Sequence, residues 1–173
     1  ERVEDQAPPC QLISVGDREA DIYELLLEAH QHRDEGVALL VRSRHNRVLE
    51  GHEQRMWDQL SAQPPQGQLT LTVPRSRGIQ QQELTLDLRY ESLRLEVPAH
   101  KRKYLKMTEP LELTVIELKE VGKEDGVHWK LLTTLEVSDA DRAAQIAGWH
   151  ARRWQIEVLH RILKAGCRVE RRQ

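Results

Sequence analysis

Two short segments of the sequence carry side chains that could bind a metal ion or a phosphate group. The first is 17–21, with the sequence DREAD, which lies between a short apolar run and an amphipathic stretch. A carboxylate such as Asp17, at the carboxyl end of a strand, stands where α/β folds place ligands and metal ions. An aspartate near a helix start is also favoured by capping and by the helix dipole. This segment alone therefore leaves a structural and a functional role open for Asp17.

The second segment lies near the end of the sequence. It carries four polar residues at positions i, i+3, i+7 and i+14, namely His150, Arg153, Glu157 and Lys164. A helix turns about 100° per residue, so these offsets place all four side chains within an arc of roughly 60°. A carboxylate among cations suits a metal ligand beside phosphates, because arginine and lysine hold the anion while the glutamate binds a hard cation. An ion-paired surface glutamate has the same pattern, and both interpretations stay open.

A strand–helix–strand pattern positions the first segment. Residues 11–16 are an apolar run ended by glycine, and 37–41 are a continuous apolar run typical of a buried strand. Between them, apolar residues from Ile22 to Ala29 recur at i, i+3, i+4 and i+7, which predicts an amphipathic helix. Because a helix connects the two strands, we expect them to be parallel.

The second segment is expected on a long helix. From Ser138 the apolar period is 3.6, and Ser138 followed three residues later by Asp141 is similar to a capping box. The helical pattern continues to Gly166, a suitable C-terminal cap. The sequence therefore predicts one helix from Ser138 to Gly166.

Between these two segments, apolar and polar residues alternate with a period of two, as in β-strands. After a helical stretch near 54–60 and a break rich in proline and glutamine, leucine and valine alternate with polar residues. The alternating runs are 69–73, 84–88, 93–97, 111–115 and 129–137. Strands with a single apolar face predict an antiparallel sheet that is covered on one side. We expect a β-rich insertion between two halves of an α/β domain.

The composition limits the class of protein. Among 173 residues, Lys and Arg number 26 and Asp and Glu 28, which argues against a uniformly basic nucleic-acid binder. Residues 1–36 hold ten acidic and three basic residues, whereas 141–173 hold eight basic and three acidic. The basic end favours a local polyanion contact, although two solvated charged faces would look the same. No apolar run approaches the roughly 20 residues of a membrane span. Two cysteines without metal-ligand spacing fit a reducing cytosol.

Taken together, the two segments resemble the DDE transposases of bacterial insertion sequences, in the subgroup with a β insertion in the catalytic domain. The family signature Y-x-x-R-x-x-x-E-x-x-x-x-x-x-K is matched at its R, E and K positions, and a histidine stands at its tyrosine position. The similarity also covers 41–45 (VRSRH) and 129–134 (WKLLTT), so it extends over most of the chain.

The resemblance implies an α+β fold, with the second half of an RNase H-like α/β catalytic core interrupted by a mostly antiparallel β insertion. Residues 1–50 would be part of that core, 51–137 the β-rich insertion and 138–173 the C-terminal helix of the core. The first acid of the family's triad would lie on a strand upstream of Asp17. Because the acidic residues before Asp17, namely Glu1, Glu4 and Asp5, lie in a polar lead-in rather than on such a strand, we expect the chain to be a fragment.

Within the resemblance, Asp17 is the second catalytic acid and Glu157 the third, and both are metal ligands. Mg²⁺ or Mn²⁺ is the implied cofactor, since hard cations take oxygen ligands and the sequence offers no Cys/His set for zinc. The residues implied to contact DNA are Arg42, Arg44, His45, Trp129, His150, Arg153 and Lys164. Trp129 resembles the tryptophan that stacks on a flipped base in relatives with a hairpin intermediate; a core tryptophan is the alternative.

The implied function of the intact parent is metal-dependent cleavage and joining of double-stranded DNA at transposon ends. The resemblance implies a dimer in the DNA-bound complex and a bacterial cytoplasmic location near the nucleoid, with no membrane partner. With two of three acids, this chain alone is expected to be inactive. One alternative is a non-catalytic DNA-binding or interaction remnant of a transposase. Another is a metal-dependent nuclease unrelated to transposition.

Overall fold

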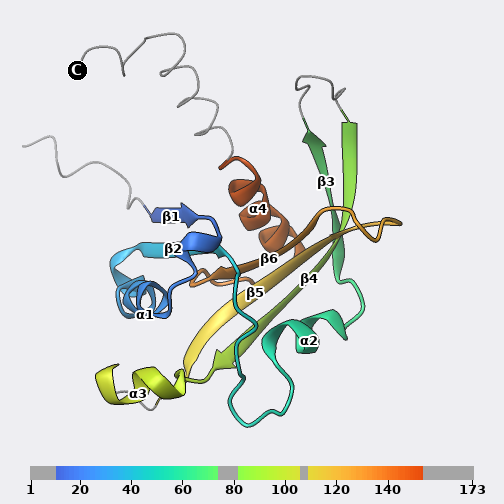
Figure 1. Ribbon diagram of the computed structural model, residues 1–173. Helices are drawn as coiled ribbons and strands as arrows, with labels where there is room; N and C mark the ends of the chain where they lie inside the picture. Colours follow the sequence, from blue (N-terminus) through green and yellow to red (C-terminus); the bar gives the residue numbers. More distant parts are fainter. Residues whose placement is uncertain (1–10, 74–81, 106–108, 154–173) are drawn as a thin grey trace, which may run out of the picture.

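The computed structural model describes residues 11–73, 82–105 and 109–153, which form a mixed α+β fold on one curled sheet (Figure 1). The strand order in this described part is β1-β2-β6-β5-β4-β3. The strands are β1 (Leu12–Gly16), β2 (Val37–Arg42), β3 (Gly67–Val73), β4 (Gln82–Leu95), β5 (Leu111–Glu120) and β6 (His128–Thr133). The helices are α1 (Tyr23–Gln31), α2 (Met56–Ser61), α3 (Ala99–Leu105) and α4 (Ala140–Ala151), with 3-10 turns η2 (Arg18–Ala20) and η3 (Arg33–Glu35).

The strands β1 and β2, with α1 between them, form the strand–helix–strand unit that the sequence predicts. The two strands are parallel, as predicted, with Leu12 opposite Val37 and Gly16 opposite Val41. The other neighbouring strands pair antiparallel. Because β2 pairs directly with β6, strands from before and after residue 50 share one sheet. The division into core and insertion stays a prediction.

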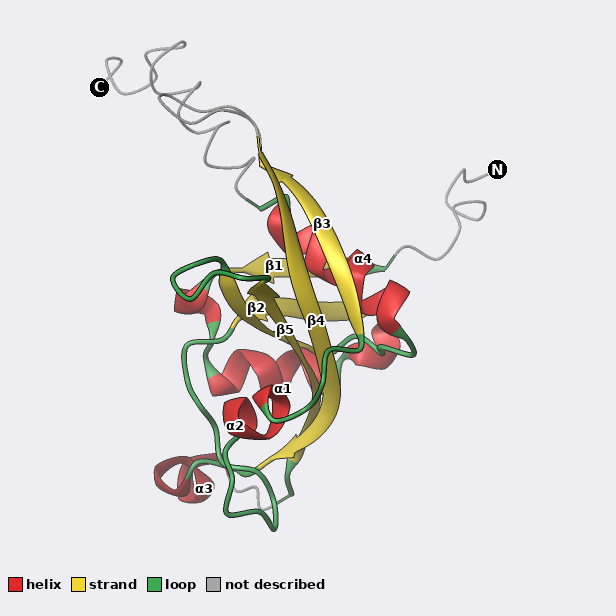
Figure 2. Cartoon of the chain, turned by 90° about the vertical axis from the view of Figure 1, so that its right-hand side faces the viewer, coloured by secondary structure: helices red, strands yellow, loops and turns green. Residues whose placement is uncertain are grey.

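The central strands are buried on both faces, which the sequence predicts for β2. The expectation of a single covered face is wrong for β5 and β6, because Val115 and Leu132 pack in one core cluster and Ile116 and Leu131 in the other. In β2, Leu39 and Val41 pack in one core cluster with α1 and α2, whereas Ala38 and Leu40 pack in a second cluster with α4. Neighbouring residues of a strand point to opposite faces. The helices α1 and α2 therefore cover one face and α4 the other; in Figure 2, α4 lies beside β3, away from α1 and α2.

The alternating runs 84–88 and 93–97 are largely one long strand, β4, rather than two. Leu84, Leu86 and Leu88 belong to the α4 cluster, whereas Leu93 and Leu95 belong to the cluster of α1 and α2. The buried leucines thus change from even to odd residue numbers along β4, so the period-2 alternation looks interrupted in the sequence. Pairing with β5 nevertheless continues from Leu86 to Leu95. The buried face changes along β4 because α4 covers one half of the strand and α1 and α2 cover the other.

The helix α4 begins at a different cap from the one expected. Asp139, rather than Ser138, accepts the backbone N–H of Arg142 at 2.7 Å, and the Ser138 hydroxyl donates to the other Asp139 oxygen at 2.8 Å. The described helix ends at Ala151, and the expected continuation to Gly166 lies outside the described residues. Among the helices of the described part, none has both the length and the apolar character that crossing a membrane requires.

Candidate functional site

Asp17 lies directly after β1, where the chain turns tightly into η2. Gly16 permits this turn, because a Cβ atom at that position would sit 2.5 Å from the Cβ of Ala20. The Oδ1 atom of Asp17 accepts the backbone N–H of Arg18 at 2.9 Å and caps η2. The capping role that the sequence left open is therefore present. It uses one oxygen of the carboxylate.

Two distant segments bring positive charge to Asp17. Arg153, just after α4, places Nη2 3.0 Å from Oδ2 of Asp17, across 136 residues of sequence. Arg42 ends β2, the neighbour of β1, and its charge also favours the ionised carboxylate. Burial opposes ionisation of Asp17, but the Arg18 N–H and the charges of Arg153 and Arg42 outweigh it, so the pKa lies below its ordinary value. The side chain is ionised at neutral pH and 41% exposed.

His150 lies on α4, one turn before Arg153, and is only 5% exposed. Its ring packs edge-on against Trp129, with ring centroids 5.6 Å apart. Burial and then the charge of Arg153 lower the pKa of His150 to about 4, so the imidazole is neutral at pH 7. A direct contact of His150 with DNA would need the ring to become exposed. Trp129 is half-buried against the α4 cluster, and its base-stacking role stays a prediction.

Asp21, the last residue of the DREAD segment, is a buried carboxylate to which the sequence analysis gave no role. Its Oδ2 accepts the backbone N–H groups of Arg44 at 2.6 Å and His45 at 2.9 Å, and its Oδ1 accepts Arg47. These contacts fix the loop after β2 against the start of α1. The donors lie 23 to 26 residues away in the sequence, so no residue spacing predicts these bonds. The presence of a second aspartate in the DREAD segment is the one sequence feature that points to this site.

Arg44 and His45, both predicted DNA contacts, have exposed side chains. They line a hollow on the loop after β2 together with Arg47 and do not join the ion pair of Asp17 and Arg153. The structure therefore gathers Asp17, Arg42, His150 and Arg153, with Trp129 against the histidine. Arg44 and His45 occupy a separate surface.

Asp17 is the predicted metal ligand that falls within the described residues, whereas Glu157 and Lys164 lie outside them. The described ranges contain no group of three or more Asp, Glu, His or Cys side chains placed to hold a metal ion. An ionised, partly exposed carboxylate such as Asp17 is a suitable oxygen ligand for Mg²⁺ or Mn²⁺. The guanidinium groups of Arg42 and Arg153 suit a phosphate. This cluster can supply one metal ligand and two phosphate donors.

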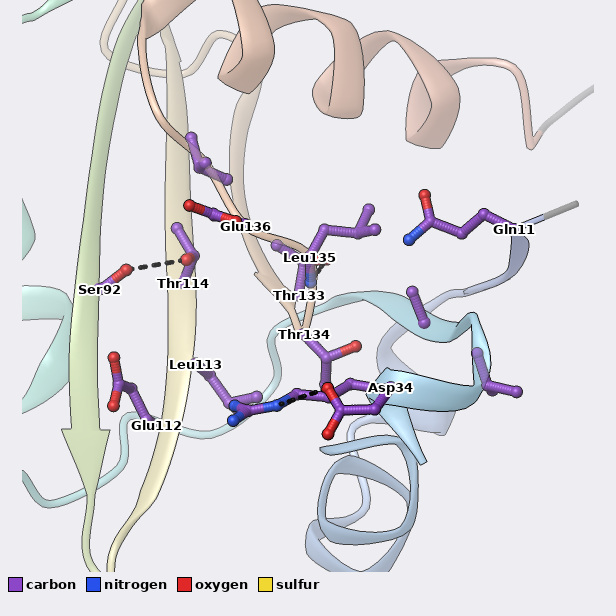
Figure 3. Close-up of a pocket in the computed structure, with 14 residues that line it drawn as sticks. Gln11, Asp34, Ser92, Glu112, Leu113, Thr114, Thr133, Thr134, Leu135 and Glu136 are labelled. Atoms are coloured by element: carbon purple, nitrogen blue, oxygen red, sulfur yellow. Dashed lines mark hydrogen bonds and ion pairs between the residues drawn. The ribbon is translucent and has the colours of Figure 1, made fainter. Parts of the chain in front are cut away.

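A second polar region lies at the other end of β2, beside Val37. A hollow of about 550 Å³ there is lined by hydroxyl and carboxylate side chains (Figure 3). Its carboxylates are Asp34, Glu112 and Glu136, of which Asp34 lies 3.8 Å from the guanidinium of Arg33. Because this lining carries more negative than positive charge, it repels a phosphate backbone. The end of the sheet at Asp17 suits nucleic acid better.

Comparisons with known proteins do not place the chain in a family. No protein-family model matches it, and no curated protein matches it either. The resemblance to the DDE transposases therefore rests on the sequence motifs.

Proposed function

We propose that the chain belongs to the catalytic domain of a DDE-type DNA transposase, whose intact form cleaves and joins DNA at transposon ends by metal-dependent phosphoryl transfer. The observation that carries this proposal is the ion pair between Asp17 and Arg153. It joins the two motifs of the resemblance, although they are 136 residues apart in the sequence. Two motifs that matched by chance would have no reason to meet within hydrogen-bond distance.

The proposed fold is the second half of an RNase H-like core with a β insertion. Three features support it: β1 and β2 are parallel, α1 connects them over one face, and α4 packs on the other face. Within the described part of the chain, β1 is one of the two edge strands of the sheet. An upstream strand that carries the first acid would pair along this edge. If that strand were parallel to β1, its carboxyl end would lie beside Asp17.

In this function Asp17 and Glu157 are metal ligands, and Arg42 and Arg153 hold a DNA phosphate. The chemistry that Mg²⁺ or Mn²⁺ supplies at such a site is activation of the attacking oxygen and stabilisation of the leaving oxygen at phosphorus. The two arginines balance the charge of Asp17 in the chain alone. A guanidinium group can form bidentate bonds with a phosphate, so both arginines are suited to hold one beside a metal ligand.

Titration of the isotopically labelled chain with Mn²⁺ tests the metal site. Paramagnetic Mn²⁺ relaxes nearby nuclei, so we expect the backbone NMR signals around Asp17 to broaden at low Mn²⁺ concentration. Asp17→Asn should abolish this broadening. Asp34→Asn, which removes an exposed carboxylate at the other end of β2, should leave it unchanged. Equal broadening around Asp34 and Asp17 would show a general attraction of cations rather than a site.

Fluorescence anisotropy with a labelled DNA duplex, over a series of salt concentrations, tests the DNA contact. The slope of log K against log[salt] is about −0.9 per phosphate neutralised. Arg153→Gln should reduce the steepness by about 0.9, whereas Arg33→Gln, the same change near the acidic hollow, should reduce it much less. Absence of DNA binding would overturn the proposal. DNA binding without a Mn²⁺ site would favour the non-catalytic DNA-binding remnant instead.

A further inference from the structure

The strand β6 ends before its two neighbours do, which leaves a gap inside the sheet. Its ladder with β2 stops at the pair of Leu40 with Thr133, and its ladder with β5 stops at Thr114 with Thr133. Beyond these pairs, β2 continues to Val37 and β5 to Leu111. Neighbouring strands lie about 4.8 Å apart, so the gap between β2 and β5 has the width of one strand.

The hollow of about 550 Å³ beside Val37 coincides with this gap, and we call it the β6 slot (Figure 3). Val37 and Ala38 of β2 line one side, and Glu112 and Leu113 of β5 line the other. Residues 134–137, which follow β6, leave the ladder and also line the slot. The hollow is therefore a missing length of strand within the sheet.

On the β2 side, backbone groups face the slot without a partner strand. The carbonyl of Leu39 accepts the Thr134 N–H at 3.1 Å, and the Leu39 N–H donates to the Thr134 hydroxyl at 3.0 Å. Alternate residues of a strand direct their N–H and C=O groups to the same side, so Val37 directs both of its groups into the slot. Beyond Thr134, the described chain forms no backbone hydrogen bond to β2 or β5.

On the β5 side, Glu112 faces the slot in the same way. Thr133 directs its backbone groups to β5, because its neighbour Thr134 binds β2. Thr114 lies opposite Thr133, so Glu112, two residues before Thr114, also faces the slot. The carbonyl of Glu112 is hydrogen-bonded to His30, which leaves the Glu112 N–H. Three backbone groups, two on β2 and one on β5, are therefore open to a ligand.

The charges around the β6 slot favour a cationic ligand. Its lining holds three carboxylates, Asp34, Glu112 and Glu136, against the guanidinium of Arg33. In Figure 3, Glu112 lies on the β5 side of the slot and Asp34 on the β2 side. A basic segment of extended chain would match both the backbone groups and the charge.

We propose that the β6 slot binds an extended segment of a partner protein that contains lysine or arginine, and that this segment continues β6 and pairs with β2 and β5. In strand addition, main-chain hydrogen bonds give affinity and side-chain contacts give specificity. The edge strands of this chain, β1 and β3, contain no lysine or arginine, so a second copy would not match the charge. The proposal concerns a protein partner and is independent of the proposed DNA chemistry.

A capped hexapeptide of alternating lysine and valine is the probe, titrated into the isotopically labelled chain and followed by amide NMR. We expect saturable shifts at Val37 and Glu112, because their N–H groups gain peptide carbonyls as acceptors. The same peptide with methyl groups on alternate backbone nitrogens should bind at least roughly tenfold more weakly, since it loses backbone hydrogen bonds. Equal binding of the methylated peptide, or shifts confined to other residues, would overturn strand addition.

Charge variants test the preference for a basic segment. Glu112→Gln/Glu136→Gln should weaken binding of the lysine peptide roughly three- to tenfold. Both side chains are exposed, so the variant is expected to fold, and its amide spectrum checks this. Glu124→Gln/Asp125→Asn removes two exposed carboxylates at the other end of β5 and should leave binding unchanged.

Two further results would contradict the proposed partner. A hexapeptide of alternating glutamate and valine should not bind, and binding as tight as that of the lysine peptide would overturn the preference for a basic segment. Shifts of Val37 and Glu112 that follow the concentration of the chain alone would place a second copy in the β6 slot and overturn the partner protein.

Discussion

Glu117 and Asp17 are both carboxylates that form ion pairs with cationic side chains. They differ in how many of their hydrogen-bond acceptor positions remain unused and could bind a ligand. Glu117 lies in β5 and its side chain is 1% exposed. Four side chains lie within hydrogen-bond distance of its oxygens: Ser61 (2.8 Å), His128 (2.8 Å), Lys130 (3.0 Å) and Arg89 (3.3 Å). Burial opposes ionisation of Glu117, but these neighbours outweigh it and its pKa lies below the ordinary value.

Asp17 also has a lowered pKa, with fewer partners. It is 41% exposed and binds one backbone N–H group and the guanidinium of Arg153. A carboxylate offers about four acceptor positions. Glu117 uses its positions to hold α2 against the sheet through Ser61, whereas Asp17 keeps some facing solvent. The comparison teaches that a lowered pKa does not by itself indicate a binding site; unfilled acceptor capacity at the surface is the better criterion.

Glu117→Ala is expected to have the largest effect on stability. The variant leaves Arg89 and Lys130, each 14% exposed, without their counter-charge. Removal of one partner from a buried ion pair costs roughly 3 kcal/mol or more of unfolding free energy. Urea denaturation followed by circular dichroism measures it. Asp17→Ala is the control and should cost less than about 1 kcal/mol. Equal losses of unfolding free energy would contradict this comparison, because Asp17 would then contribute as much to stability as Glu117.

His150 should make the cluster around Asp17 sensitive to mild acid. Its pKa is about 4 in the folded chain, against an ordinary value of 6.5. As the pH falls from 7, the unfolded chain takes up this proton first, so stability is lost progressively from pH 6.5 down to pH 4. Between pH 7 and pH 5 the expected loss from this residue is roughly 2 kcal/mol.

Urea denaturation at pH 7 and at pH 5 measures the contribution of this histidine. His150→Phe keeps an aromatic ring beside Trp129 and should remove most of the difference between the two pH values. The same pH dependence in the variant and in the native chain would show that the imidazole is not the group responsible.

Asp17→Asn should have the smallest effect, and it acts on DNA binding rather than on stability. Without a metal ion, the Asp17 carboxylate repels phosphates and occupies Arg153. In the presence of EDTA, the variant should bind duplex DNA about two- to fivefold more tightly, as expected for loss of one exposed charge. Asp34→Asn removes the same charge at the other end of β2 and should change affinity less. Weaker DNA binding by Asp17→Asn would contradict the idea that Arg153 interacts with both the Asp17 carboxylate and a DNA phosphate.

Local patterns predict the parts of the fold whose partners are near in sequence. The periods of strand and helix are set by backbone geometry, so the unit β1–α1–β2 and its parallel pairing follow from residues 11–41. The continuity of β4 does not follow, because the face that is buried depends on which helix covers it. The helix α4 covers Leu88, and α1 and α2 cover the cluster that contains Leu93.

The candidate site shows the same division between local and distant signals. Asp17 can be singled out from its position after an apolar strand, whereas no spacing or local pattern predicts its ion pair with Arg153. The partners of Asp21 give no local signal in the sequence. Arg47 lies 26 residues from Asp21, and no periodic pattern relates the two.

Under the proposed function, the bonds from Asp21 to the loop after β2 have a consequence for the length of DNA that would bind. They hold the surface that carries Arg44 and His45 at a fixed separation from the Asp17 cluster. Once one phosphate of a strand is bound, the next contact is intramolecular, and its effective concentration depends on whether the strand spans that separation. A mononucleotide would gain from one site alone. Affinity should therefore rise abruptly at the shortest oligonucleotide that reaches both surfaces. That length would report the distance at which the Asp21 bonds hold the two surfaces apart.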